Sequence, residues 1–264
     1  SFLQQWLNDS SELKVMTSGS TGVPKEICLR KEHMKNSAKA TGVFLKLGVN
    51  TRALLCLSPN YIAGKMMLVR ALELGWDIDV VKESGSPLEQ LDKVYDFVAM
   101  VPLQLSNSLQ FLHRIKTLIV GGASVSPRLC QSLQGESCAV YATYGMTETT
   151  SHIALKRLNH GQNKKELEIY RVLPEVSISV DHRGCLVIDA NKVSSERIIT
   201  NDLVKIVGKD TFHWLGRQDT VVNSGGIKLI PEQIEIKLVE IISQRFFLAG
   251  LPDETLGEKL VLLI

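Results

Sequence analysis

The 264-residue sequence lacks paired cysteine motifs and long apolar runs. Its five cysteines are an odd number scattered without a CxxC pair, which is typical of free thiols in a reducing cytosol. The longest apolar runs, such as LVLLI, are far too short to span a bilayer, and the first residues lack the basic and apolar segments of a signal peptide. We therefore expect a cytoplasmic protein without membrane insertion.

The sequence also lacks a strong excess of charge. Its net charge of +2 implies no broad basic surface, so nucleic acid is not an expected partner. With 44% hydrophobic residues the chain can form a large core, and its length is typical of one or two domains. The oligomeric state stays open, a homodimer included.

Short apolar runs alternate with helical patterns in the first two thirds of the chain. The expected buried strands are 52–59, 97–102, 116–123 and 138–145. Helical patterns lie between them at 62–75 and 126–135. Strand–turn–helix repeats predict an α/β fold with a mainly parallel sheet, which binds ligands at the carboxyl ends of its strands.

The pattern changes after about residue 166. Alternating residues on both sides of DHRG in 176–189 predict a hairpin, and short strands continue to about residue 216. We therefore expect a large domain over 1–216, α/β to about 165 and β-rich over 166–216. A small α+β domain would begin at 217, with a helix opened by Pro231. Because GEKLVLLI ends in mid-strand, we expect this domain to be incomplete and part of the natural C-terminus to be missing.

The stretch TSGSTGVPK, residues 17–25, has the composition of a phosphate-binding loop. Gly19 and Lys25 have the separation of the G-x-x-x-x-G-K-[ST] motif. However, Pro24 replaces its second glycine, and Glu26 replaces its Mg²⁺-binding hydroxyl. These two differences argue against that class of NTPase, and an ordinary surface loop remains an alternative.

The same stretch resembles the phosphate loop of the adenylate-forming superfamily, which includes acyl-CoA synthetases, luciferases and adenylation domains. Further motifs of that superfamily follow in order: LIVGGA at 118–123, YGMTET at 144–149, TNDLVKI at 200–206, LGRQDTVVNSGGIKLIPEQIE at 215–235 and GLPDETLGEKLVLLI at 250–264. Asn201 stands where the superfamily usually has glycine. The resemblance covers nearly the whole chain and implies the two-domain fold of these enzymes, with a large α/β domain and a small C-terminal domain.

The resemblance implies a two-step reaction. A carboxylate attacks the α-phosphorus of ATP, giving acyl-AMP and pyrophosphate, and the thiol of coenzyme A then displaces AMP. The residues implied to hold the β- and γ-phosphates are Thr17, Ser18, Gly19, Ser20, Thr21, Gly22 and Lys25. Thr147 would touch the α-phosphate and Glu148 would bind Mg²⁺, since carboxylates suit this hard ion. Thr147, Glu148 and Lys25 are thus the implied catalytic residues, although Glu148 could simply be an acid at a helix N-terminus.

The other motifs imply the remaining nucleotide contacts. Those on the adenine side are Tyr144, Gly121, Gly122 and Ala123. Asp202 would bind the ribose hydroxyls and Arg217 the ribose or phosphate, while Asp219 would be the hinge of the small domain. Gly225 and Gly226 would line the pantetheine channel, where the lack of a side chain permits close approach. A core tyrosine at a strand end and a simple glycine turn remain the alternatives for Tyr144 and for the two glycines.

Two departures from the superfamily bear on activity. The phosphate loop begins at Thr17, whereas most relatives carry over a hundred residues before it, so we expect a short form. The superfamily also has a late lysine that drives adenylation, and this chain ends before that position. Lys25 cannot be assumed to replace it, so we expect this sequence as given to adenylate poorly.

Three features resemble the 2-succinylbenzoate–CoA ligases of menaquinone synthesis. They are the short N-terminus and the stretches SPNYIAGKMMLVRALELG and YGMTETTSHIALK. The second, aromatic carboxylate of that substrate needs a cation, and the resemblance assigns it to Arg70, a partly exposed helix arginine being the alternative. His152 could face the acyl pocket or be a structural histidine.

Three other functions stay open. One is a ligase for another aryl or fatty acid, or a stand-alone adenylation domain. The second is a non-catalytic nucleotide-binding relative, and the third is a phosphotransferase with a Walker loop.

Overall fold

A computed structural model describes residues 2–16, 26–160 and 166–264. The chain forms two compact units, Ser1–Val176 with Ala190–Arg197, and Ser177–Asp189 with Ile198–Ile264. Within the described ranges, no helix is long and apolar enough to cross a membrane.

The first unit is built on a seven-strand stretch of sheet. Its strands are β3 (Arg52–Leu55), β4 (Asp77–Val80), β5 (Tyr95–Met100), β6 (Ile115–Val120), β7 (Ala139–Gly145), β8 (His152–Arg157) and β9 (Ile169–Val172). They lie in the order β4-β3-β5-β6-β7-β8-β9. The four expected strands and the two expected helices of this region are therefore present, with boundaries shifted by a few residues.

The sheet is mixed, and the expectation of a mainly parallel sheet holds only from β4 to β7. Strands β3 to β7 pair in parallel, whereas β8 runs antiparallel to both β7 and β9. A parallel neighbour needs a long crossover, but only six residues, 146–151, separate β7 from β8. That short turn makes β8 antiparallel.

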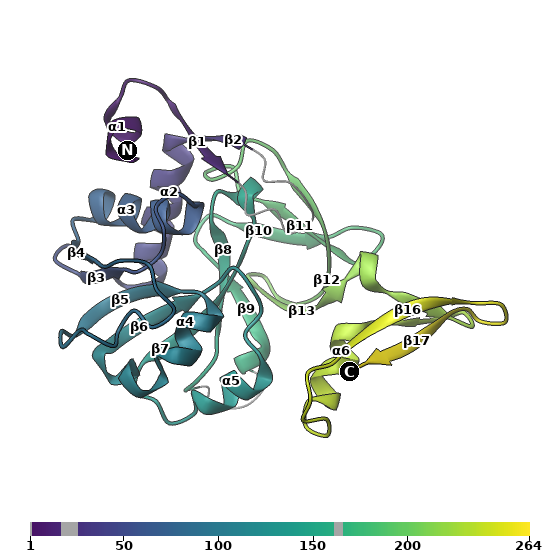
Figure 1. The fold of residues 1–264 in the computed structure, drawn as a ribbon. Coiled ribbons are helices and arrows are strands. Elements are labelled where there is room, and N and C mark those ends of the chain that lie inside the picture. The colour runs from purple at the N-terminus through teal and green to yellow at the C-terminus, as the bar shows by residue number, and fades with distance from the viewer. Residues whose placement is uncertain (1, 17–25, 161–165) are drawn as a thin grey trace. The chain divides into compact units, whose positions relative to one another are not determined.

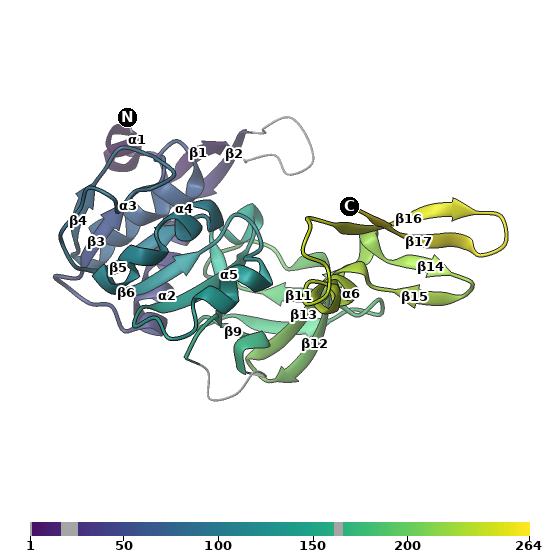
Figure 2. The ribbon, with the colours of Figure 1, turned by 60° about the horizontal axis from the view of Figure 1, so that its bottom comes forward.

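Helices cover both faces of the parallel strands (Figures 1 and 2). The helices and 3₁₀ helices of this unit are α1 (Phe2–Leu7), α2 (Lys31–Leu45), α3 (Ile62–Leu74), α4 (Pro102–Asn107), η1 (Leu109–Arg114), α5 (Pro127–Ser132), η2 (Thr147–Thr149) and η3 (Glu166–Glu168). Successive strand residues alternate between two cores, so that Val98 packs with α4 and η1 whereas Phe97 packs with α2 and α3. Burial on both faces explains why these strands have continuous apolar sequences.

An antiparallel pair precedes this sheet. β1 (Glu12–Met16) and β2 (Glu26–Arg30) pair so that Met16 lies opposite Glu26, and Met16 also forms a parallel bridge with Tyr61. Leu13 and Val15 of β1 are buried with α1, α2 and α3. The pair thus fixes the described residues on both sides of 17–25 against the helices of the first unit.

The second unit is antiparallel. One sheet contains β10 (Ser177–Val180), β11 (Cys185–Asp189), β12 (Ile198–Gly208) and β13 (Thr211–Arg217). The other has the order β15-β14-β17-β16 and consists of β14 (Val222–Ser224), β15 (Ile227–Leu229), β16 (Phe247–Asp253) and β17 (Gly257–Leu263). Helix α6 (Pro231–Leu238) and η4 (Gln218–Thr220) complete the unit. The hairpin expected around DHRG is confirmed.

The two compact units do not coincide with the expected division at residue 217. The β-rich segment β10–β13 clusters with the C-terminal strands, because α6 packs on β13 and the Gln233 amide donates to Leu215 O at 2.8 Å. The functional boundary at 217 therefore stays a prediction.

Gly64 allows α3 to approach the preceding loop closely. A Cβ at Gly64 would lie 2.2 Å from Ser58 O, a backbone atom that cannot move aside alone. We expect Gly64→Ala to lower the free energy of unfolding by about 1–3 kcal/mol. Urea unfolding measures this, with Gly48→Ala as the control, since a Cβ at Gly48 meets nothing within 4 Å. Equal stability of the two variants would contradict this packing.

Candidate functional site

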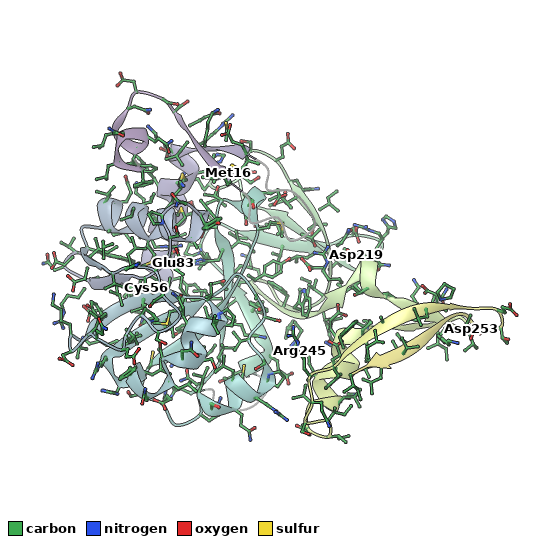
Figure 3. The ribbon with its side chains drawn as sticks, viewed as in Figure 1. Met16, Cys56, Glu83, Asp219, Arg245 and Asp253 are labelled. Atoms are coloured by element: carbon green, nitrogen blue, oxygen red, sulfur yellow. The ribbon has the colours of Figure 1, made fainter. Side chains whose placement is uncertain are left out.

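The phosphate loop expected at residues 17–25 lies outside the described residues. This applies to Thr17, Ser18, Gly19, Ser20, Thr21, Gly22 and Lys25. Figure 3 labels Met16, where the described part of β1 ends. The phosphate-binding roles of these residues stay predictions.

The turn between β7 and β8 carries Thr147 and Glu148. A Cβ at Gly145 would lie 2.4 Å from Ser151 O, so the chain can close on itself here only with glycine. Thr149 is fully buried, and its Oγ1 accepts the Met146 N–H at 2.9 Å. These constraints hold the turn in one conformation, with Thr147 half-buried and Glu148 exposed.

Thr150 stores backbone strain in this turn. Its φ of +66° is unfavourable for a β-branched residue. Its hydroxyl donates to Val193 O at 2.8 Å, which anchors the turn to the segment Ala190–Arg197. Strain of this kind is typical of functional sites, where the surrounding structure compensates for it.

Glu148 fits the predicted role of a Mg²⁺ ligand. Mg²⁺ is usually held by one or two carboxylates together with substrate phosphates and water. In the described part of the chain, no three His, Cys, Asp or Glu side chains gather as a metal cluster. A single exposed carboxylate on a fixed turn therefore suits a metal that arrives with a phosphorylated substrate.

The ends of β6 and β7 bring together the residues predicted for the adenine side. Gly121 follows β6, and a Cβ there would lie 2.3 Å from Thr143 Oγ1 of β7. Gly122 has a φ of +82°, so Ala123 follows a turn that requires glycine. The Tyr144 ring lies 5.7 Å from that of Tyr170 at an interplanar angle of 60°, a contact that no motif predicts.

Arg70 and His152, 82 residues apart in sequence, lie side by side. Arg70 Nη2 donates to Ser151 Oγ at 3.2 Å and lies 3.5 Å from His152 Nδ1. Only 2% of Arg70 is exposed, so the alternative of a partly exposed arginine is excluded. We call Arg70, Ser151 and His152 the candidate acid-binding site. Ser151 was not predicted as a site residue from the sequence, although it directly precedes His152.

The charge of Arg70 is not compensated by an acidic side chain among the described residues. Its Nε has no hydrogen-bond partner there, and its Nη1 is near only Met67 Sδ, at 3.9 Å. Burial lowers the pKa of Arg70 to about 10, which still leaves it protonated at neutral pH. The candidate acid-binding site is therefore a buried cation surrounded by neutral groups, and an anion would be its natural ligand.

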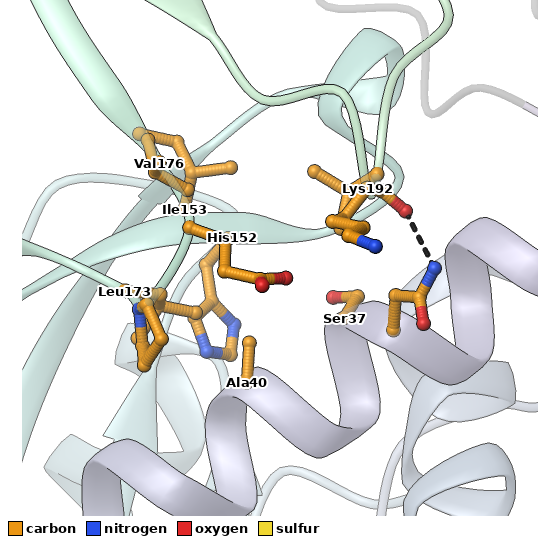
Figure 4. A pocket seen from close by; sticks show the side chains of 11 residues that line it. Ser37, Ala40, His152, Ile153, Leu173, Val176 and Lys192 are labelled. Carbon is orange, nitrogen blue, oxygen red and sulfur yellow. Dashed lines mark hydrogen bonds between the residues drawn. The ribbon is translucent and has the colours of Figure 1, made fainter.

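The His152 ring lies against α2, beside Ala40 (Figure 4). Burial, and secondly the charge of Arg70, hold its pKa well below the usual 6.5. A cavity of about 20 Å³, large enough for one water molecule, adjoins His152 between Ser37 and Leu173. The buried ring is therefore neutral at neutral pH.

In the second unit, Asp202, Arg217 and Asp219 form one cluster. Asp202 is 6% exposed, and its Oδ1 accepts the Trp214 indole N–H at 3.1 Å and lies 3.8 Å from Arg217 Nη1. Arg217 donates to both carboxylate oxygens of Asp219, at 3.1 and 3.0 Å, and the pKa of Asp219, labelled in Figure 3, is lowered chiefly by this bond. Trp214 was not predicted from the sequence.

Asn201 and the two late glycines have local structural roles. Asn201 Oδ1 accepts a hydrogen bond from Arg183 Nη1 at 3.0 Å, which gives this unusual residue a partner. Gly225 and Gly226 form the two-residue turn between β14 and β15, with φ of +58° and +83°. The turn alone accounts for both glycines, so their pantetheine role and the hinge role of Asp219 stay predictions.

Comparison with known proteins gives a consistent picture. Residues 15–192 match the family described as "AMP-binding enzyme". The chain is 26% identical to a 2-succinylbenzoate–CoA ligase of Haemophilus influenzae over 94% of its own length and 58% of that protein. It thus spans little more than half of that relative.

Solved structures match nearly the whole chain. An acyl-CoA synthetase (AMP-forming)/AMP-acid ligase II-like protein of Dyadobacter fermentans is 42% identical, with a TM-score of 0.78, over 99% of this chain and 77% of that one. The O-succinylbenzoate coenzyme A synthetase of Bacillus subtilis, solved with ATP and magnesium, has a TM-score of 0.77 at 19% identity, over 94% and 58% of the two chains. This second similarity concerns the fold alone.

The neutral state of His152 predicts a pH-dependent stability. The unfolded chain binds a proton at this residue as the pH falls through about 6.5, whereas the folded chain does not until lower pH. The unfolding free energy should therefore fall below pH 6.5, by at most about 1.4 kcal/mol per pH unit from this group. The stabilisation is fully present above that pH.

Urea unfolding between pH 5 and 8 measures this effect as the difference between the native protein and His152→Gln. Replacing the exposed His182 by Gln is the control. Parallel pH profiles for the native protein and His152→Gln would contradict a buried neutral His152.

Proposed function

This chain belongs to the family of AMP-binding enzymes, and from that premise we propose that it is the main part of an ATP-dependent acid–CoA ligase. The acid attacks the α-phosphorus of ATP to give acyl-AMP and pyrophosphate, and coenzyme A then takes the acyl group. Thr147 and Glu148 contribute a hydroxyl and a carboxylate from the fixed turn after β7. Asp202 and Arg217 contribute the ribose and phosphate contacts.

The proposed acid is 2-succinylbenzoate, and the buried charge of Arg70 carries this part of the proposal. The acid has a succinyl carboxylate, which is activated, and a ring carboxylate, which needs a partner. Arg70 offers a desolvated guanidinium whose Nε–H has no partner in the part of the chain that the structure describes, and a carboxylate can accept two hydrogen bonds from such a group. The Haemophilus influenzae relative, which bears the name 2-succinylbenzoate–CoA ligase, supports the same substrate.

In this reaction the chain's own residues orient the two reactants. Arg70 fixes the ring end of the acid from α3, and Ser151 and His152 hold Arg70 from the start of β8. Thr147 and Glu148 lie three to five residues before them in the same turn. A bound Mg²⁺ would neutralise phosphate charge beside Glu148. This arrangement favours in-line attack mainly by positioning and electrostatics.

Product analysis of the full-length protein tests the reaction. With ATP, Mg²⁺, coenzyme A and 2-succinylbenzoate we expect AMP and pyrophosphate but no ADP. The matched acid 4-oxo-4-phenylbutanoate, which lacks only the ring carboxylate, should react with a KM roughly 10–100-fold higher. Equal KM values for the two acids would contradict the substrate, and tight adenylate binding without turnover would favour a non-catalytic relative.

Replacement of Arg70 tests the residue itself. Arg70→Ala should raise the KM for 2-succinylbenzoate roughly 100-fold or more, since it leaves the ring carboxylate without its partner. It should leave the KM for ATP and the KM for 4-oxo-4-phenylbutanoate nearly unchanged. Arg52→Ala is the control, because Arg52 is an exposed arginine at the start of β3. An unchanged KM for 2-succinylbenzoate in Arg70→Ala would refute the assignment.

A further inference from the structure

We propose that Thr41 is a positioning residue: it fixes the tautomer of His152 so that the Nδ1 lone pair faces Arg70, and it thereby orients the guanidinium for a carboxylate. This inference rests on the proposed function in so far as the carboxylate is that of the substrate. Thr41 lies on α2, is fully buried and belongs to no motif.

The hydroxyl hydrogen of Thr41 is already committed within its own helix. Thr41 Oγ1 donates to Ser37 O, four residues earlier, at 2.9 Å. The same oxygen lies 3.2 Å from His152 Nε2. A hydroxyl has one hydrogen, so towards His152 the oxygen of Thr41 accepts. The hydrogen of the second bond must therefore belong to Nε2.

This assignment determines the other ring nitrogen. A neutral imidazole carries one N–H, so a protonated Nε2 leaves Nδ1 as an acceptor. Arg70 can only donate, and its Nη2 lies 3.5 Å from Nδ1. Each hydrogen bond in the series then joins one donor to one acceptor. Arg70 donates to His152, His152 donates to Thr41, and Thr41 donates to Ser37 O. The pKa of His152, held low by burial and by Arg70, supports a neutral ring.

The opposite tautomer would lose a hydrogen bond at each end. Its Nδ1–H would face the N–H groups of Arg70, so Nη2 would lose His152 as an acceptor, and Nη2 and Nδ1–H would both have to donate to Ser151 Oγ, which lies 3.2 Å from Nη2 and 3.5 Å from Nδ1. Thr41 would have to turn its hydrogen from Ser37 O towards Nε2. In the buried position of His152, 7% exposed, no bulk water can compensate for these losses. Thr41 therefore selects the tautomer that Arg70 requires.

With this tautomer, the N–H groups of Arg70 at Nε and Nη1 remain for a ligand. Ser151 Oγ and His152 Nδ1 both approach Nη2. Within residues 2–16, 26–160 and 166–264, Nε has no hydrogen-bond partner and Nη1 is near only Met67 Sδ. Arg70 lies on α3, His152 on β8 and Thr41 on α2. The series of hydrogen bonds that starts at the guanidinium therefore connects three elements of the first unit. A carboxylate that enters the site would meet a guanidinium that is already oriented.

The tautomer can be observed directly, without turnover. The full-length protein labelled with ¹⁵N-histidine is studied by long-range ¹H–¹⁵N correlation NMR, and His152 is assigned by the signal lost in His152→Gln. We expect a protonated Nε2 and an unprotonated Nδ1 in the native protein and in Thr41→Ser. Thr41→Val, which keeps the shape but not the hydroxyl, should shift His152 towards the other tautomer.

Ser37→Ala is the matched control for this measurement. Ser37 lies one turn away on the same helix and is as deeply buried as Thr41. Its hydroxyl has no hydrogen-bond partner among the residues described, and the substitution keeps its carbonyl. It should leave the His152 signals unchanged. A protonated Nδ1 in the native protein, or an unchanged tautomer in Thr41→Val, would overturn the proposal.

Kinetics separate this inference from the proposed function. Thr41→Val should raise the KM for 2-succinylbenzoate roughly five- to twentyfold, whereas Thr41→Ser should restore it. The KM values for ATP and for 4-oxo-4-phenylbutanoate should not change. If Arg70→Ala raises the KM for 2-succinylbenzoate and Thr41→Val does not, the positioning role of Thr41 is wrong. If Arg70→Ala has no effect either, the proposed substrate is wrong, and with it the ligand role of Thr41.

Discussion

Removing a guanidinium from water costs several kcal/mol unless a carboxylate or a full set of hydrogen bonds compensates for it. Arg70 is 2% exposed, and its side-chain contacts among the described residues are with the neutral Ser151, His152 and Met67. The folded chain therefore holds this charge at a cost that an anionic ligand would offset. An apolar side chain at this position would pack more favourably between α2, α3 and β8 than a charged one. Binding of an anion would explain why an arginine lies there.

The turn after β7 connects this charge with the rest of the candidate site. Gly145, buried Thr149 and strained Thr150 fix its backbone. Thr147 and Glu148, proposed to meet ATP and its metal, thus share one rigid segment with the two residues that hold Arg70. Small displacements of this turn would move both groups together. Such coupling suits a reaction whose main requirement is the alignment of acid and nucleotide.

Much of the fold could be predicted because buried strands are continuous apolar runs, as in β5 and β6. The antiparallel β8 was missed because a short turn, not the strand's composition, sets its direction. Motifs predicted Arg70 and His152, but their contact depends on long-range packing across 82 residues. Thr41 and Trp214 were missed because one hydrogen bond from a buried hydroxyl or indole leaves no periodic signal. The hydrogen bond from Arg183 to Asn201 likewise could not be predicted, because it depends on the pairing of β12 with the hairpin of β10 and β11.

The proposed function depends most on the recognition between Arg70 and the ring carboxylate of the acid. Calorimetric titration with two non-hydrolysable acyl-AMP analogues, with and without the ring carboxylate, measures this coupling directly when native protein and Arg70→Ala are compared. We expect a coupling free energy of about 2 kcal/mol or more, because close charge pairs in desolvated sites reach this magnitude. A coupling near zero, with both analogues bound equally by both proteins, would contradict the account.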